Sequence, residues 1–380
     1  MIKNNIVNRL NQFLYYSFFT FIMLISFSLS AQKEEGKKDK NGNNQGLWKY
    51  FYSNGNLKAS GSYDNGKKTG TWKYWFEDGN LNTIENIKDG LLNGETTYYY
   101  ENGQIKSQGN YLDGKQNGQW KYYYESGQLK AVEFLVTGLR NETNTYYHPN
   151  GQLKSQGNYI KGEPNGKWTF YYDNGQLEVI SNYVNNKREG FETHYHKNGK
   201  IKIQGLFKEG KKESLWKYWY DNGILSDSKN YIDDKLNGKW YNYSIENELV
   251  FEKEYKDGEK NGVCKYYSEG KLISESSYEK NKLNGKRIIY NKEGKIKISQ
   301  TWLNGNLEGE YYSIYPNGIY SEKGYYFNNK KIGFWQIFHV NGEKLAEGFY
   351  EKGERSGTWK YYNFYGKLDE NKNYSANSRK

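Results

Sequence analysis

Several kinds of residue are scarce in this 380-residue chain, and the shortages exclude whole classes of structure. The single cysteine, Cys264, rules out an internal disulfide and a metal site built from several thiolates. Three prolines leave long stretches free for uninterrupted strand pairing. Hydrophobic residues make up only 35% of the chain and the mean hydropathy is −1.08, values that by themselves favour disorder.

Aromatic residues, by contrast, are abundant and indicate a folded β protein. They form 18% of the chain, with 41 Tyr and 11 Trp, and such rings bury large areas and favour strands. The net charge is +11, and removal of an N-terminal segment that carries Lys3 and Arg9 leaves 11 − 2 = +9. This charge could serve an anionic partner. We favour the simpler interpretation that a Lys- and Asn-rich composition spreads it thinly along a long rod.

Residues 1–31 have the organisation of a secretory signal peptide. Lys3 and Arg9 accompany an apolar run over residues 13–29, and Ser30 and Ala31 offer small side chains for cleavage. Because the run is close to the minimum length of a membrane span, an uncleaved N-terminal anchor is the alternative. We expect an exported protein, periplasmic, cell-surface or secreted, in which a polar linker (32–45) leads into the rest of the chain.

A 24-residue pattern repeats fourteen times over residues 46–380 and decides the architecture. Every step is 24 residues except the 23 from Gly262 to Gly285. Such a chain is one periodic object in which contacts form between neighbouring copies. The first residue of each copy, called position 1, is Gly46, Gly70, Gly94, Gly118, Glu142, Gly166, Gly190, Ser214, Gly238, Gly262, Gly285, Gly309, Gly333 or Gly357.

Each copy is predicted to be a β-hairpin. In the first copy, positions 3–7 are aromatic enough for a strand, and Asn54-Gly55 follows, a residue pair preferred in two-residue type I′ turns. A second polar turn, at residues 64–68, returns the chain to the next copy. Only the ninth copy lacks the glycine of the first turn and has Asn247, the next most tolerant residue for that backbone shape.

A two-residue turn would fix the register of the two strands. Tyr52 would then pair with Leu57, and Trp48 with Gly61, so that a large ring lies opposite glycine. With two strands per copy at about 4.8 Å spacing, each copy advances about 9.6 Å. We therefore predict an all-β fold, an elongated and twisted antiparallel ribbon of about 14 hairpin repeats of 24 residues.

Three short elements recur in the copies: a Gly-x-Trp-x-x-Tyr-Tyr opening, the Asn-Gly turn, and a Gly-x-Tyr-x-x-Gly ending such as residues 61–66. Together they resemble the MORN repeat, over about 335 of the 380 residues. Gly55 and Gly61 lie one residue farther apart than in the ordinary MORN unit, which indicates the bacterial MORN-variant class, often labelled as antitoxins. The resemblance implies repeats used as scaffolds, dimerisation surfaces or membrane-associated modules.

Groups that could support catalysis or bind a metal are sparse. His194 and His196 lie two apart on one predicted strand and so point the same way, but no third ligand accompanies them. We expect both to replace the tyrosine usual at their positions. The sequence has no Gly-x-Ser-x-Gly elbow, phosphate loop or zinc-protease motif, and its carboxylates stand isolated within single copies. We expect no enzymatic activity, no cofactor and no metal site.

One row of side chains could bind a ligand. Position 6 points away from the Trp face yet is aromatic in thirteen copies, and position 13, its expected cross-strand neighbour, is often lysine. Aromatic rings lined with lysine at about 9.6 Å intervals could stack sugar rings or hold an anionic polymer. The alternative is that the rings only stack on one another to stabilise a thin sheet. The candidate binding residues are Phe51, Trp75, Tyr99, Tyr123, Tyr147, Tyr171, Tyr195, Trp219, Lys58, Lys106, Lys130 and Lys154.

The leading hypothesis is an exported, non-catalytic repeat protein that serves as a binding scaffold for another protein or for an envelope glycan or anionic polymer. A structural spacer without a specific ligand is the second hypothesis. An antitoxin-like partner-binding protein is the third, although an antitoxin acting in the cytoplasm would need no export signal. Nucleic acid is a poorer candidate for an exported protein, although a basic and aromatic surface would permit it. The terminal copies leave sheet edges through which molecules could self-associate.

Overall fold

The computed structural model describes residues 33–374, and the predicted signal peptide (1–31) lies outside the described residues. The chain divides into two compact units, Met1–Glu163 and Pro164–Lys380. Over residues 33–374 the backbone forms strands joined by turns, which confirms the all-β prediction. No helix within that range is long and apolar enough to cross a membrane.

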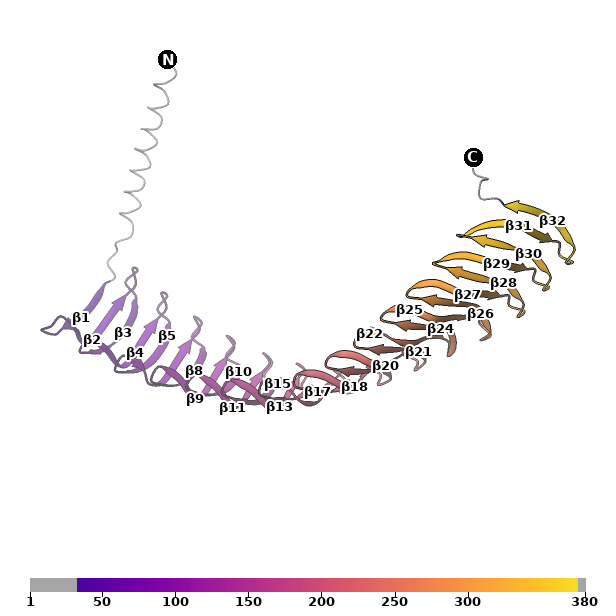
Figure 1. Cartoon of the computed structure of the whole chain (residues 1–380). Helices are drawn as coiled ribbons and strands as arrows, with labels where there is room; N and C mark the ends of the chain where they lie inside the picture. The colour runs from indigo at the N-terminus through magenta and orange to yellow at the C-terminus, as the bar shows by residue number, and fades with distance from the viewer. Residues whose placement is uncertain (1–32, 375–380) are drawn as a thin grey trace, which may run out of the picture. The chain divides into compact units, whose positions relative to one another are not determined.

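The strands of the first unit follow one another as antiparallel hairpins, each paired with its neighbours along the chain (Figure 1). They are β1 (Glu34–Lys38), β2 (Asn44–Phe51), β3 (Leu57–Asp64), β4 (Lys67–Trp75), β5 (Leu81–Lys88), β6 (Leu91–Leu92), β7 (Gly94–Tyr99), β8 (Ile105–Leu112), β9 (Lys115–Tyr123), β10 (Leu129–Val136), β11 (Leu139–Tyr147) and β12 (Leu153–Ile160).

The same arrangement continues in the second unit (Figure 1). Its strands are β13 (Glu163–Tyr171), β14 (Leu177–Val184), β15 (Lys187–Arg188), β16 (Gly190–Tyr195), β17 (Ile201–Lys208), β18 (Lys211–Trp219), β19 (Leu225–Ile232), β20 (Lys235–Tyr243), β21 (Leu249–Lys256), β22 (Glu259–Lys260), β23 (Gly262–Ser268), β24 (Lys271–Glu279), β25 (Lys282–Tyr290), β26 (Ile296–Leu303), β27 (Asn306–Ile314), β28 (Tyr320–Phe327), β29 (Lys330–Phe338), β30 (Lys344–Glu351), β31 (Glu354–Tyr362) and β32 (Leu368–Tyr374).

The register of each hairpin agrees with the prediction at one end and departs from it at the other. Trp48 pairs with Gly61, as predicted. The predicted pair of Tyr52 and Leu57 is wrong, because Leu57 pairs with Phe51. The register shifts beside Phe51, so that Lys58 is left as the extra residue of a β-bulge. Position 6 therefore pairs with position 12, and position 13 has no direct cross-strand partner in the hairpin.

We predicted the two-residue turn at the Asn-Gly pair and only a polar turn at residues 64–68, and in the first copy the structure shows the reverse. At Asn54-Gly55 only the glycine has a positive φ, 90°, and its N–H donates to the Tyr52 carbonyl at 3.0 Å, which makes a three-residue loop. The two-residue turn with positive φ at both central residues lies instead at Asn65 (49°) and Gly66 (77°). The type I′ prediction was therefore placed on the wrong turn.

The Asn of the Asn-Gly pair recurs because it links neighbouring copies. The Asn54 Oδ1 atom accepts the Asn56 N–H at 2.9 Å, and its Nδ2 donates to the Glu77 carbonyl of the next copy at 3.1 Å. The same link to the next copy is made by Asn102, Asn174, Asn198, Asn317 and Asn341. A turn glycine with an asparagine before it is thus explained by both backbone conformation and hydrogen bonding.

A second ladder of hydrogen bonds runs along the same turns. At position 7, the Tyr52 hydroxyl donates to the Trp75 carbonyl of the next copy at 2.7 Å. Tyr100 and Tyr124 repeat this contact in the first unit, and Tyr172, Tyr220 and Tyr315 repeat it in the second.

We expect Tyr100→Phe to lower the free energy of unfolding by about 1 kcal/mol, since the variant loses this hydrogen bond and leaves a carbonyl without its donor. Urea denaturation of the purified protein would measure the difference. Tyr99→Phe, which changes the adjacent ring on the opposite face, is the control and should have a smaller effect. Equal effects of the two variants would contradict a structural role for the ladder.

The short tenth copy has lost the extra residue of its loop. Glu269 and Gly270 have φ values of 51° and 70°, and Ser268 pairs with Lys271 across them. This copy thus makes the two-residue turn that we predicted for all fourteen. The step of 23 residues from Gly262 to Gly285 is explained by this change of turn.

The core is a column of position-3 residues, mostly tryptophan, and five of these rings lie over a glycine of the preceding copy, whereas Trp240 lies beside Lys229. A Cβ atom on Gly61 would lie 2.2 Å from the Trp72 ring, so only glycine leaves room for that ring. The Trp72 Nε1–H donates to the Ser62 carbonyl at 3.1 Å, and the Lys68 ammonium lies 4.2 Å from the ring centroid. Trp120, Trp216, Trp335 and Trp359 lie over Gly109, Gly205, Gly324 and Gly348 in the same way.

The segment predicted as a polar linker (32–45) contains strand β1, which pairs with β2. Its Gly36 lies under the Trp48 ring as Gly61 lies under Trp72, and the Trp48 Nε1–H donates to the Lys37 carbonyl at 3.2 Å. β1 is therefore half a repeat that covers the first tryptophan. Its sequence, EEGKK, is charged and exposed at this edge of the sheet.

Candidate ligand-binding face

The two faces of the hairpins differ in how many of their side chains pack against other residues of the protein. Because successive side chains of a strand point to opposite faces, positions 3, 5, 14, 16 and 18 share the tryptophan face. Rings there pack on each other, as Tyr63 does on Trp72 with centroids 5.1 Å apart. Positions 2, 4, 6, 12, 15 and 17 share the other face, which we call the open face. A ligand could reach side chains on the open face without disturbing the core.

The structure places the position-6 rings on the open face, where each of them is half-buried. Phe51 pairs with Leu57, and Tyr99 with Ile105. Trp75, Tyr123, Tyr147, Tyr171, Tyr195 and Trp219 pair in the same way with the aliphatic residue at position 12. Aliphatic neighbours cover part of each ring, so the position-6 row is less accessible than the sequence suggested.

The lysines of position 13 do not line this row as predicted. Lys58 lies 5.5 Å from the centroid of the Tyr52 ring, and Lys106 and Lys130 lie at similar distances from the Tyr100 and Tyr124 rings, all at position 7. Lys154, in the fifth copy, is exposed. The β-bulge explains the correction, because it removes position 13 from the place opposite position 6.

A groove of about 370 Å³ lies on the open face in copies twelve and thirteen. Tyr320, Tyr325 and Phe334 line it with exposed fractions of 42%, 50% and 42%. Phe334 also packs on Phe349, with ring centroids 5.2 Å apart, and Phe349 is 55% exposed. Tyr325, Phe334 and Phe349, which we call the groove row, come from the consecutive strands β28, β29 and β30.

Polar side chains form a second row beside the groove row. Lys323 pairs with Tyr312 on one side and with Gln336 on the other, and Gln336 pairs with Glu347. The Lys323 ammonium lies 5.3 Å from the centroid of the Tyr320 ring and 5.6 Å from that of Phe338, a position-6 residue. The groove thus joins the position-6 row to a run of hydrogen-bonding groups.

The charges around the groove nearly cancel. Lys323 and Glu310 both line it, and Glu347 forms an ion pair with Lys344 at 2.9 Å. Below the groove, burial and the nearby Glu322 carboxylate raise the pKa of Tyr326 to about 12, so that this phenol is neutral at physiological pH. The groove therefore offers rings and hydrogen-bonding groups without a strong net charge.

Sequence reasoning missed this groove because it looked for residues that recur in every copy. The groove depends on departures from the repeat at positions 2 and 17. In the fifth copy these positions are Thr143 and Asn158, whereas in copies twelve and thirteen they include Tyr325, Phe334 and Phe349. A comparison of copies position by position, restricted to the open face, could have found the signal.

Each histidine of the pair contacts another group of the protein. His196 Nε2 lies 2.9 Å from the Trp219 carbonyl, so this ring takes the place of the position-7 tyrosine, as we predicted. His194 Nε2 lies 2.7 Å from Glu192 Oε1. Cys264, at position 3, is buried in the core, as predicted for a packed strand residue. Over residues 33–374, no group of three or more His, Cys, Asp or Glu side chains is placed to hold a metal ion.

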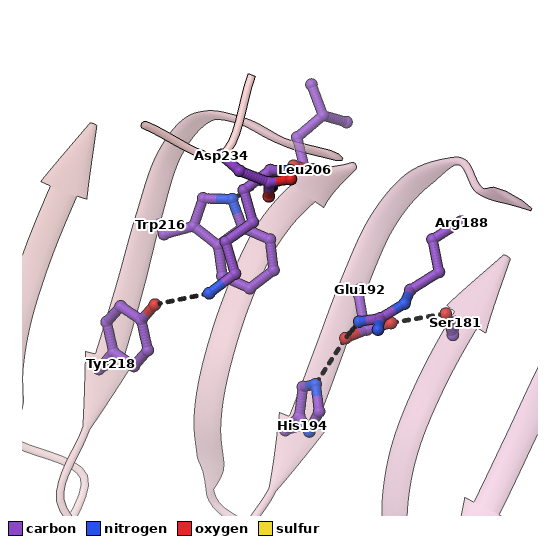
Figure 2. A network of polar contacts seen from close by, with 9 residues as sticks. Ser181, Arg188, Glu192, His194, Leu206, Trp216, Tyr218 and Asp234 are labelled. Atoms are coloured by element: carbon purple, nitrogen blue, oxygen red, sulfur yellow. Dashed lines mark hydrogen bonds and ion pairs between the residues drawn. The ribbon is translucent and has the colours of Figure 1, made fainter. Parts of the chain in front are cut away.

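Glu192 is a buried charged replacement in the tryptophan column (Figure 2). It is 4% exposed, and its carboxylate accepts hydrogen bonds from Ser181 at 2.7 Å and Arg188 at 3.3 Å besides its contact with His194. Burial alone would raise the pKa of Glu192, but these partners outweigh it and lower the pKa. Trp216 occupies the equivalent place in the next copy (Figure 2). The cluster fills a core position and faces away from the groove.

The fold and the recurring core define a class of protein, a β-hairpin repeat protein. Eight segments match the family described as MORN repeat variant: residues 44–65, 68–89, 92–113, 116–134, 143–161, 164–185, 188–209 and 260–280. The chain is a MORN-variant repeat protein, as its resemblance predicted. No curated protein matches it.

Solved structures that align with the chain are remote. A crystal structure of TcdB2-TccC3-Cdc42 aligns over 88% of this chain and 23% of its own, with 10% identity and a TM-score of 0.16. The Photorhabdus luminescens Tc holotoxin pore with the mutation TccC3-D651A aligns over 89% of this chain and 18% of its own, with 13% identity and a TM-score of 0.15. The chain spans about a fifth of the length of these proteins. Scores this low give no information on its fold or function.

Proposed function

We propose that this protein is an exported, non-catalytic scaffold that holds a partner on its open face, in the groove of copies twelve and thirteen. The observation that supports it is the groove row, three rings exposed by 42–55% on adjacent strands. Exposed aromatic clusters of this kind mark binding surfaces. The tryptophan column, in which Trp335 is fully buried, gives the rings a rigid support.

The proposal predicts that retention of the chain by cell-envelope material depends on the groove. Residues 32–380 would be purified and passed over immobilised envelope fractions from the organism that makes the protein. Tyr325→Ser combined with Phe334→Ser should reduce retention about tenfold or more, since central aromatic residues dominate binding energies. Phe191→Ser is the matched control, because Phe191 is also at position 2 and is 69% exposed, in the seventh copy.

Unchanged retention of the groove variant, with folding confirmed by circular dichroism, would favour a structural spacer. Export is tested separately by cell fractionation with an antibody against the chain. Recovery in the cytoplasm would contradict export and would favour the antitoxin-like alternative.

A further inference from the structure

The groove row has a spacing that suits a linear ligand. Tyr325, Phe334 and Phe349 lie on successive strands of one sheet, and paired strands are about 4.8 Å apart. Phe334 and Phe349 are direct cross-strand partners with ring centroids 5.2 Å apart, whereas Tyr325 pairs with Ile332. The 5.2 Å spacing is close to the advance per sugar in an extended, β-1,4-linked glycan, so that consecutive sugars could meet these two rings, with Tyr325 on the adjacent strand β28.

The polar row supplies the second half of such a site. Sugars have apolar C–H faces and hydroxyl groups around the ring edge, and hydroxyls both donate and accept hydrogen bonds. Lys323 donates, Glu310 accepts, and the Gln336 amide does both. The Gln336 amide already donates to Glu347 at 3.2 Å, which holds it in place beside Phe334. Rings on one side and hydrogen-bonding groups on the other match the two surfaces of a sugar chain.

Two other polymers fit the groove less well. An anionic polymer would meet Glu310 as well as Lys323, so the groove offers it no net attraction. An extended peptide that binds by strand addition needs a free sheet edge. β28 is paired with both β27 and β29, so its backbone groups are already used.

From these observations we infer that the groove binds a neutral, linear glycan, with sugar faces on the groove row and hydroxyls on Lys323, Gln336 and Glu310. The inference rests on the proposed function and names its ligand class. The charges of Lys323 and Glu310 in the groove cancel, so the net charge of +9 on residues 32–380 plays no part in the proposed binding.

The test is titration of residues 32–380 with cellohexaose and with chitohexaose, followed by calorimetry and by NMR of the aromatic side chains. We expect at least one of these neutral glycans to bind with little dependence on salt. Phe334→Ala and Tyr325→Ala should each weaken binding about tenfold, and Phe191→Ala should leave it unchanged. Heparin is the anionic comparison and should bind more weakly, in a way that salt abolishes.

Three results would overturn the inference: no binding of either glycan, binding that Phe334→Ala leaves unchanged in a folded protein, or tighter binding of heparin through the groove. Competition with the two hexaoses separates this inference from the proposed function. Retention that depends on the groove but is not reduced by excess cellohexaose or chitohexaose would keep the scaffold and exclude the glycan. Retention that does not depend on the groove would contradict both.

Discussion

Trp335→Ala should lower the free energy of unfolding of the surrounding copies by about 3–5 kcal/mol, the range for removing a fully buried tryptophan. The Trp335 side chain is 0% exposed and lies over Gly324. It packs against Tyr326 with ring centroids 5.3 Å apart, and the Lys331 ammonium lies 3.8 Å from its centroid. Alanine would leave a cavity lined by these groups and would remove the cation–π contact of Lys331.

Hydrogen exchange would show where this stability is lost. Since contacts in a repeat protein form between neighbours, protection should fall in β28–β31 and stay near its original level in β16–β19. Phe334→Ala is the control, because the adjacent residue faces the groove and is 42% exposed. It should change stability by less than about 1 kcal/mol and should affect binding instead. Equal loss of protection throughout the unit would show that its copies unfold together.

The architecture could be predicted from the sequence because the same pattern occurs fourteen times. A single Gly-x-Trp segment is weak evidence, whereas a fixed period makes each copy a test of the others. The pair of Trp48 and Gly61 was predicted from a two-residue turn and is confirmed, because the β-bulge at Lys58 compensates for the longer loop. What the period did not reveal is that the glycine also makes room for Trp72 of the next copy. Contacts between copies depend on strand pairing that only the folded chain shows.

The turn type could not be decided from Asn-Gly alone. Both a two-residue turn and a three-residue loop use a glycine with positive φ. The folded chain adopts the three-residue loop at Asn54 and also where Asp78 or Ser126 replaces this asparagine, so the Asn54 amide does not make the choice. That choice moves Lys58 into a bulge and changes which residues meet on the open face. An error of one residue in a turn thus became an error in the predicted binding site.

The groove shows a wider limit of reasoning from repeats. Averaging over copies identifies what the fold needs, and it hides what one copy has and the others lack. In this chain the recurring residues serve the tryptophan column and the turn ladders, as Trp335 and Tyr100 do. The departures at Tyr325 and Phe334 have no such structural role, since both rings are exposed. Departures from the pattern on an exposed face are therefore the better guide to function.

The Glu192 cluster offers the converse case, a departure within the core. We expect Glu192→Trp alone to destabilise the seventh copy by about 1–3 kcal/mol, because the new ring would collide with the Ser181 side chain. Ser181→Gly added to it should restore stability to within about 1 kcal/mol of the original protein or above it, since apolar packing often replaces a buried ionic cluster without loss. Arg188 would then lie over the ring as Lys212 lies over Trp216, at 4.4 Å from its centroid.

Urea denaturation of the original protein, the two single variants and the double variant gives the interaction energy between the positions. A favourable coupling of about 1–3 kcal/mol is expected. The basis is the next copy, where Gly205 and Trp216 already form the pair that the double variant would create. Additive effects would mean that the size of the residue at position 16 does not determine whether position 3 can accept tryptophan. Coupling would show that the two positions change together, so that the core accepts either tryptophan over glycine or a carboxylate with its own partners.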